Sequence, residues 1–223
     1  MNITYLELTT NGLHIQWEYY SKVLELPVRM FENCLQVIAR NTEILFTKSD
    51  TDFDGAYHFA FNIPENQFRK AKKWISSRTP LLTDDDGKDE FHSDNWNSKS
   101  VYFKDAAGNV LEFIARHNLK NAVKGSFDSS QILNVSEIGL PSEDVIAFAD
   151  ELCVKMNLSV FKQGPSETFT PVGDDNGLLI LPAKDRIWIP NSGVPAKLLP
   201  VKVNIEVNGK GWSIRGYPYK VIG

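Results

Sequence analysis

The chain has 223 residues, of which 42% are hydrophobic and 23% are charged, and its formal net charge is −4. This is enough for one compact body or two small domains with ordinary hydrophobic cores. The mildly acidic balance argues against nucleic acid as the main partner, because phosphate binding needs a basic patch. The basic residues between 69 and 73 are typical of the solvent face of one amphipathic helix.

The sequence has no feature of a membrane protein or of a protein from an oxidising compartment. Residues 1–7 lack the basic region and apolar run of a signal peptide, and no stretch approaches the roughly 18 apolar residues of a membrane span. Cys34 and Cys153 lack zinc-site spacing and are expected to be reduced thiols. We therefore expect a cytoplasmic monomer or homodimer that binds a small molecule, and neither nucleic acid nor membrane.

Three stretches of the chain share one plan, in which a short alternating strand is followed by a turn and an amphipathic helix. The strands are predicted at 3–8, 57–63 and 133–140. The apolar residues of the following helices recur at helical spacing: Leu13, Trp17, Tyr20 and Leu24; Phe68, Ala71 and Ile75; Val145, Phe148, Leu152 and Met156. The same local order thus occurs three times.

Short strands separated by turn residues follow each helix. They are predicted at 28–31, 35–39 and 44–47, then within the polar stretch 81–94 and at 100–104 and 110–115, then at 159–162, 168–172 and 178–181. The repeating unit is therefore β-α-β-β-β, with a helix on one face of a small sheet and the other face free to pair.

The fourth unit is incomplete. A strand is predicted at 200–207, the pair Asn208-Gly209 is a strong turn signal, and 211–222 can return as one or two strands. No helix of normal length fits this part of the chain. The segment 118–131 is polar and rich in turn residues, which is typical of a linker.

The stretch from Ser100 to Phe113 carries the most specific motif. It has an aromatic residue, a basic residue, Asp105, two small residues, Gly108, Asn109, two apolar residues and Glu112. This order resembles the last-strand signature of the vicinal oxygen chelate superfamily, which contains glyoxalases, bleomycin resistance proteins and extradiol dioxygenases. Ala106 stands where that signature has proline. The segments 19–26 and 58–61 are similar to other parts of the pattern, and the likeness covers 1–116 well and 132–190 loosely.

The resemblance implies an α+β fold of paired βαβββ modules, the glyoxalase, bleomycin resistance and dihydroxybiphenyl dioxygenase fold, with a degenerate second half. It divides the chain into a first domain of two modules at 1–117, the linker at 118–131 and a second, truncated domain at 132–223. It also implies a cavity on the concave face of the sheet. Val110, Glu112 and Ile114 share one strand face, so Glu112 would point into that cavity.

Metal ligands in this superfamily are a histidine on the first strand of each paired unit and a glutamate on the last strand. The resemblance places His58 and Glu112 at two of these positions. The first-unit position falls on Tyr5, with Glu7 on the same face, and the third-unit position falls on Glu137. Pairing of units one and two would give Tyr5, His58 and Glu112, whereas pairing of units two and three would give Glu137, His58 and Glu112.

We therefore expect a divalent metal (Fe, Mn, Ni or Zn) at His58, Glu112 and Glu137, with Glu7 or Tyr5 as the alternative third ligand. The first hypothesis is a metal-dependent enzyme, such as a dioxygenase or lyase, acting on a small oxygenated substrate, with aromatic ones among the candidates. No catalytic residue beyond the ligands is assigned. The alternative is a metal-free protein that binds or sequesters a small ligand, as bleomycin resistance proteins do.

Two further expectations concern the pocket and the scaffold. In the metal-free alternative Tyr5 and Trp96 line the ligand pocket, and Trp188 and Trp212 are further candidates for its walls. A third hypothesis is an interaction module that keeps only the scaffold.

Overall fold

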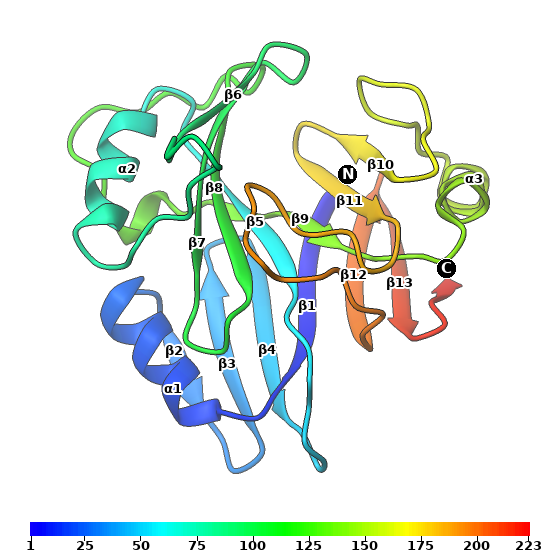
Figure 1. Cartoon of the computed structure of the whole chain (residues 1–223), viewed down its shortest axis with the longest axis horizontal. Coiled ribbons are helices and arrows are strands. Elements are labelled where there is room, and N and C mark those ends of the chain that lie inside the picture. Colours follow the sequence, from blue (N-terminus) through cyan, green and yellow to red (C-terminus); the bar gives the residue numbers. More distant parts are fainter.

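The computed structural model describes residues 1–223, and the chain folds into two seven-stranded sheets (Figure 1). The first sheet has the order β14-β13-β12-β1-β4-β3-β2. Its strands are β1 (Asn2–Thr10), β2 (Val28–Met30), β3 (Cys34–Ala39), β4 (Thr42–Lys48), β12 (Val201–Val207), β13 (Lys210–Gly216) and β14 (Lys220–Ile222).

The second sheet has the order β10-β11-β9-β5-β8-β7-β6. Its strands are β5 (His58–Ile63), β6 (Phe91–Ser93), β7 (Ser98–Lys104), β8 (Val110–Arg116), β9 (Asn134–Gly139), β10 (Phe169–Asp174) and β11 (Gly177–Pro182). The predicted α+β architecture of repeated units is confirmed, since each of the first three units contributes a helix and several strands.

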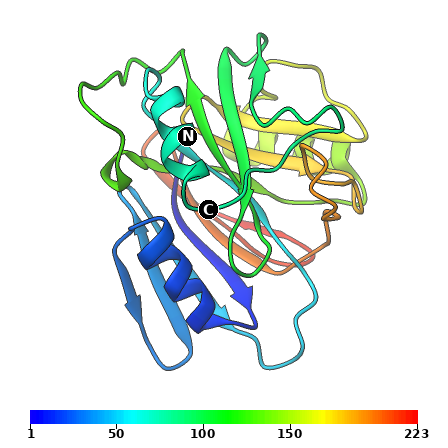
Figure 2. The ribbon, with the colours of Figure 1, turned by 60° about the vertical axis from the view of Figure 1, so that its left-hand side comes forward.

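The helices form where the apolar spacing predicts them. They are α1 (Leu13–Glu18), which continues as a π-helical turn at Tyr19–Val23, α2 (Phe68–Ser76) and α3 (Val145–Met156). In Figure 2, α1 lies against the first sheet and α2 against the second, on the same side of the molecule. The side chain of Asp144 caps α3 by accepting from the backbone N–H of Ala147 at 3.0 Å. None of these helices has the length and apolar character required to cross a membrane.

The pairing of the units is set by two antiparallel contacts between first strands. β5 pairs with β9, which joins units two and three in the second sheet, and β1 pairs with β12, which joins units one and four in the first. Of the two pairings left open by the sequence, the structure thus contains the one between units two and three. Both sheets combine strands from the two sides of 118–131, so this segment connects β8 to β9 within one sheet.

One face of each sheet is packed in a common core, and the other face of the second sheet is where the site lies. The core contains 44 buried hydrophobic residues drawn from both sheets and the helices. Leu111 and Leu179 belong to it, whereas Val110, Leu178 and Ile180, which alternate with them, belong to a separate cluster of six. This smaller cluster therefore borders the opposite face of the second sheet.

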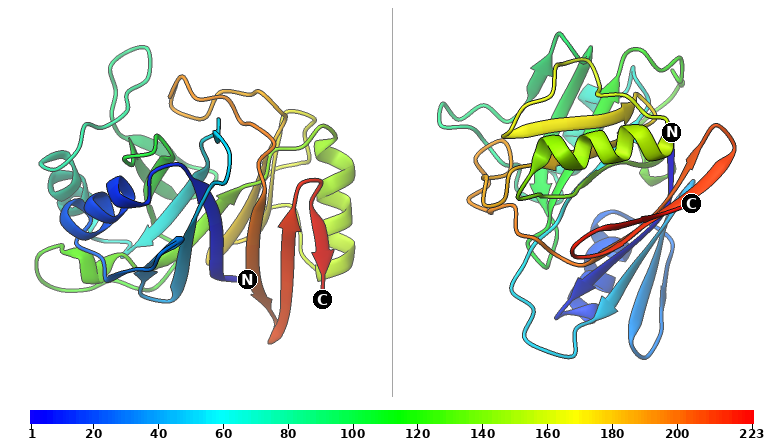
Figure 3. Two further views of the ribbon diagram at one scale, coloured as in Figure 1. Left: turned by 90° about the horizontal axis from the view of Figure 1, so that it is seen from below. Right: turned by 90° about the vertical axis from the view of Figure 1, so that its right-hand side faces the viewer.

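One segment differs from the sequence expectation, since the strand predicted at 159–162 is reduced to a single bridge between Val160 and Val172. The strand predicted within the polar stretch 81–94 is the short strand β6. The fourth unit has no helix, as expected, and α3 lies beside its strands β13 and β14 (Figure 3), where Phe148 stacks on Tyr219 at 5.4 Å. The helix of unit three thus also covers part of the fourth unit.

Candidate functional site

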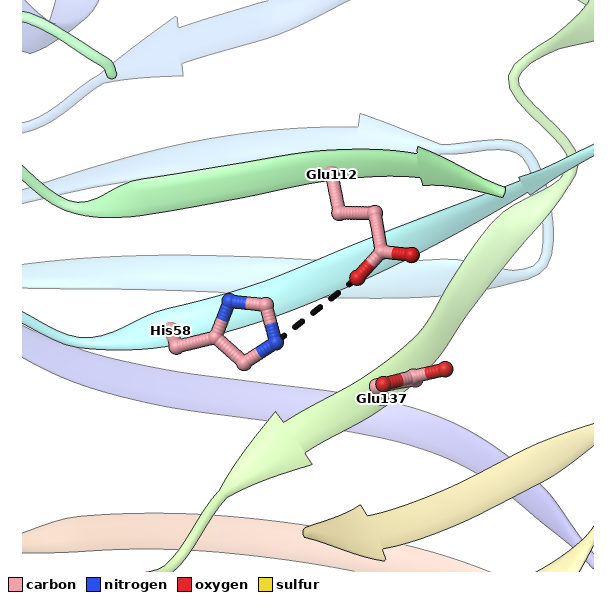
Figure 4. Close-up of side chains that lie close together, drawn as sticks. All are labelled: His58, Glu112 and Glu137. Atoms are coloured by element: carbon pink, nitrogen blue, oxygen red, sulfur yellow. Dashed lines mark ion pairs between the residues drawn. The ribbon is translucent and has the colours of Figure 1, made fainter. Parts of the chain in front are cut away.

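Three neighbouring strands of the second sheet bring His58, Glu112 and Glu137 together. The central strand β5 has Ala60 opposite Glu112 on one side and opposite Glu137 on the other. Residues directly opposite each other point to the same side of a sheet, as do residues two positions apart on one strand. The side chain of His58, two residues before Ala60, therefore points to the same side as both glutamates (Figure 4).

The three side chains have their ligand atoms within 4.8 Å of one another, and all three are buried. The His58 Nε2 atom lies 3.8 Å from Glu112 Oε2. The other ring nitrogen, Nδ1, lies 3.0 Å from the carbonyl oxygen of Val110. A carbonyl oxygen only accepts, so Nδ1 carries the proton and the lone pair of Nε2 faces the carboxylates.

Burial is the main influence on the protonation of His58 and Glu112. It lowers the pKa of His58 to about 4, against a weaker upward effect of its hydrogen bond to Val110, so the imidazole is neutral at pH 7. Burial and the charge of Glu137 raise the pKa of Glu112 to about 8, although hydroxyl groups of Ser100 and Tyr102 and the charge of Arg116 act in the other direction. A proton is therefore held at Glu112 at neutral pH when no cation is bound.

Arg116 is fully buried on the same strand face as Glu112 and Ile114, and its Nη2 donates to Oε1 of Glu137. Burial raises the pKa of Glu137, and this contact with Arg116 opposes the shift. The other oxygen of Glu137 accepts no hydrogen bond, so it remains available to a ligand. The rings of Trp96 and Phe161 cover the guanidinium at 5.4 and 5.8 Å, and its Nε and Nη1 have no hydrogen-bond partner.

A cavity of about 280 Å³ opens above the three side chains. Five aromatic rings line it, from Phe91, Trp96, Tyr102, Phe169 and Trp188. The Trp188 ring is buried and packs on the His58 imidazole with a centroid distance of 4.9 Å. The segment 183–199 carries Trp188 across this face of the sheet and closes one wall of the cavity.

The donor set fits a divalent cation. One imidazole nitrogen and carboxylate oxygens suit Fe, Mn, Ni and Zn, and ligands about 2.1 Å from a common ion lie at most about 4.2 Å apart. The separation of 3.8 Å between His58 and Glu112 meets this limit. The 4.8 Å span of the whole set requires a small rotation of a glutamate side chain. The unpartnered Nε2 of His58 and the free oxygen of Glu137 are the donors such an ion would use.

The structure places the other predicted site residues as follows. Trp96 lines the cavity, as does Trp188. Tyr5 and Glu7 lie on β1 in the first sheet, where the Tyr5 hydroxyl donates to Glu7 at 2.8 Å and Lys202 approaches both. They are not at the cavity, because β1 pairs with β4 and β12 and not with β5. Trp212 also lies in the first sheet, on β13.

Arg116 and Arg186 are two residues of the site that were not predicted from the sequence. Arg116 could have been found, because it is two positions beyond Ile114 and four beyond Glu112 on a strand whose alternation was recognised. Arg186, which lines the cavity, lies in the irregular segment 183–199, where no periodicity indicates the direction of a side chain.

No protein-family model matches the sequence, and no curated protein sequence does. Among solved structures, a dioxygenase candidate from Bacillus subtilis is similar with a TM-score of 0.59 and 18% identity, over 82% of this chain and 63% of that protein. The chain thus spans less than two thirds of the Bacillus protein.

A point mutant of glyoxalase I from Zea mays is similar over nearly the whole chain. The TM-score is 0.57 at 11% identity, and the match covers 99% of this chain and 88% of the maize protein. Similarity at such low identity concerns the fold, and it extends to all four units. The chain has the paired βαβββ fold of the vicinal oxygen chelate superfamily, as the motif from Asp105 to Glu112 predicts.

Proposed function

We propose that the chain binds a divalent metal through His58, Glu112 and Glu137 and is an enzyme acting on a small oxygenated substrate in the cavity above them. The observation that carries this proposal is the convergence of the three side chains from three strands, with their ligand atoms within 4.8 Å. Three protein ligands leave coordination positions open towards the cavity, as in catalytic metal sites.

The residues around the ligands support the proposal, because each has an identifiable positioning role. The carbonyl of Val110 fixes the tautomer and ring orientation of His58. Arg116 holds one oxygen of Glu137, and Trp188 packs on the His58 ring on the cavity side. Burial raises the pKa of Tyr102, so its hydroxyl stays protonated and keeps its hydrogen bond to Glu112.

A metal at these ligands would act as a Lewis acid on a substrate that offers two neighbouring oxygens. The chain itself would bind and orient that substrate. The aromatic walls exclude water from the reacting end, which strengthens electrostatic interactions inside the cavity. The structural relatives are named as a glyoxalase and as a dioxygenase candidate, so glyoxalase and dioxygenase assays are the first two activity tests.

The direct test is the metal content of protein purified without chelator, followed by thermal unfolding with added Mn²⁺, Zn²⁺, Ni²⁺ or Fe²⁺. We expect one metal per chain and metal-dependent stabilisation. Loss of a residue that hydrogen-bonds to a metal ligand typically weakens metal binding about 10–100-fold. His58→Ala removes a ligand itself, so it should weaken metal binding by more than that. His92→Ala is the matched control, since His92 lies at the rim of the cavity and is exposed. Equal metal content in both variants would refute the ligand assignment.

A second candidate function, metal-free binding of a small ligand, is favoured by one observation. Arg116 already compensates the charge of Glu137, and Glu112 holds a proton at neutral pH, so the three side chains are electrically balanced without a cation. In that case chelator-treated protein should be stabilised by an aromatic ligand as strongly as untreated protein. A stabilisation that disappears with the chelator would favour the enzyme instead.

A further inference from the structure

We propose that the ligand of this cavity is a small planar carboxylate, whose carboxylate is bound by Arg186 while its other end faces His58, Glu112 and Glu137. This inference rests on the proposed function for the orientation of the ligand, but the anion-binding step depends on Arg186 alone. Arg186 lies between β11 and β12, in the segment 183–199, and lines the same cavity as the three candidate metal ligands.

Arg186 has no counter-ion in the structure. Its side chain makes no hydrogen bond, and no carboxylate oxygen lies within 4.0 Å of it, whereas Arg116, beside the same cavity, is paired with Glu137. The guanidinium carbon lies over the ring of Phe169, 4.8 Å from the ring centroid. Arginine remains charged in proteins, so a half-buried guanidinium without a partner favours a bound anion.

The backbone that carries Arg186 is fixed before any ligand binds. The Arg186 carbonyl accepts from the N–H of Ala196 at 2.9 Å, and the N–H of Trp188 donates to Val194 at 3.0 Å. The Nζ atom of Lys104, on β7, anchors the same segment by donating to the carbonyl of Ser192 at 2.9 Å. The guanidinium therefore needs only side-chain rotation to meet an anion, which lowers the entropic cost of binding.

The charges around the cavity also favour an anion. Glu112 and Glu137 together offset one divalent cation, and this leaves the charges of Arg116 and Arg186 uncompensated. Arg116 is sealed beneath Trp96 and Phe161, whereas Arg186 lines the open cavity. A neutral ligand would leave both positive charges in partly buried surroundings, whereas a carboxylate bound at Arg186 would offset one of them.

The volume and the lining of the cavity restrict the class of ligand further. Its volume of about 280 Å³ lies just below the roughly 300–1,000 Å³ of drug-sized pockets, so it fits a single-ring molecule. Rings at Phe169 and Trp188 line it near the two polar ends, and planar ligands pack well against such surfaces. The guanidinium fork matches a carboxylate through two parallel hydrogen bonds.

The test compares benzoate with benzamide, which has the same shape and no charge, on chelator-treated full-length protein by isothermal titration calorimetry. We expect benzoate to bind at least about tenfold more tightly. Arg186→Gln should abolish this preference, and Arg186→Lys should restore part of it. Lys184→Gln is the matched control, because Lys184 lies on the same segment, pairs with Glu143 at 3.6 Å and does not line the cavity.

The same comparison is repeated with 3,4-dihydroxybenzoate and catechol on Zn²⁺-loaded protein, where the carboxylate should again add affinity only when Arg186 is present. If the protein prefers benzoate but binds no Zn²⁺, anion binding at Arg186 is supported and the proposed metal site is refuted. Equal affinities for benzoate and benzamide in the unmodified protein, or a preference that survives in Arg186→Gln, would overturn it.

Discussion

The indole of Trp188 occupies the space that a side chain at Gly139 would fill. A Cβ atom at position 139 would lie 2.9 Å from Cζ2 of the indole and closer still to Cη2. Gly139 is two residues beyond Glu137 on β9, and the same indole packs on His58. The absence of a side chain on one strand thus allows an aromatic ring to reach the imidazole on the next.

Gly139→Ala should therefore displace Trp188 and destabilise the protein by about 1–3 kcal/mol, which is typical of overpacking a dense site. Urea unfolding measures the change, and a shift of tryptophan fluorescence reports the movement of the ring. Gly211→Ala is the control, since a Cβ there meets nothing within 4 Å. Unchanged stability and fluorescence in Gly139→Ala would contradict the packing described above.

The metal-free protein should lose stability as the pH rises from 6.5 to 8. The pKa of Glu112 is raised to about 8 in the folded state, so its stabilising proton is lost as the pH rises towards that value. The pKa of His58 is lowered to about 4, so its contribution is lost only as the pH falls below about 6.5. The two effects oppose each other between about 4.5 and 6.5, and only the effect of Glu112 remains above that range.

The expected loss between pH 6.5 and 8 is at most about 2 kcal/mol, at 1.36 kcal/mol for each pKa unit. It is measured by urea unfolding in the presence of a chelator, with Glu112→Gln as the matched variant. That variant carries no titratable group at position 112 and should have a flatter profile. A slope of equal size in both proteins would show that another group is responsible.

Removal of Arg116 should be among the most damaging single changes. Arg116→Met leaves Glu137 buried without its counter-ion, at a cost of about 3–5 kcal/mol. The double variant with Glu137→Gln should recover part of this loss, because the unpaired charge is gone. Arg78→Met is the control, since the pair of Arg78 with Glu25 is at the surface and contributes less than about 1 kcal/mol. Strictly additive effects in the double variant would argue against the coupling.

Asp105, the first residue of the motif from Asp105 to Glu112, has a structural role away from the cavity. In the turn between β7 and β8 its carboxylate accepts from Gln16 at 2.7 Å, from Tyr20 at 3.0 Å and from the Asn109 side chain at 2.8 Å. Asp105→Ala leaves these buried donors unpaired and should cost on the order of 3 kcal/mol or more. Asp94→Ala, at an exposed position, should change the free energy of unfolding by less than about 0.5 kcal/mol.

Much of the fold follows from local pattern. The alternation along β8 predicts that Glu112 points away from the core, and the helical stripes predict α2 and α3 with their buried residues. The motif from Asp105 to Glu112 specifies a turn between two strands, and the structure has that turn. These features depend on near neighbours in the chain, which is why the sequence reveals them.

The partner of each unit could not be predicted in the same way. A free strand edge on β5 is compatible with β1 or with β9, and the choice decides whether Tyr5 or Glu137 stands beside His58. That choice depends on contacts between residues far apart in sequence, which periodicity does not report. The position of Arg186 could not be predicted for the same reason. The conformation of an irregular segment depends on the surface against which it packs, and not on a local pattern.

Units two and three pair with each other between units one and four, and this order has a consequence for folding during synthesis. The sheet that carries the cavity is complete once residue 182 is available, because its strands run from β5 to β11. β1, although made first, must wait for β12 before both of its edges are covered. Contacts between segments as far apart in the chain as β1 and β12 form slowly. One edge of β1 would therefore stay unpaired during most of translation.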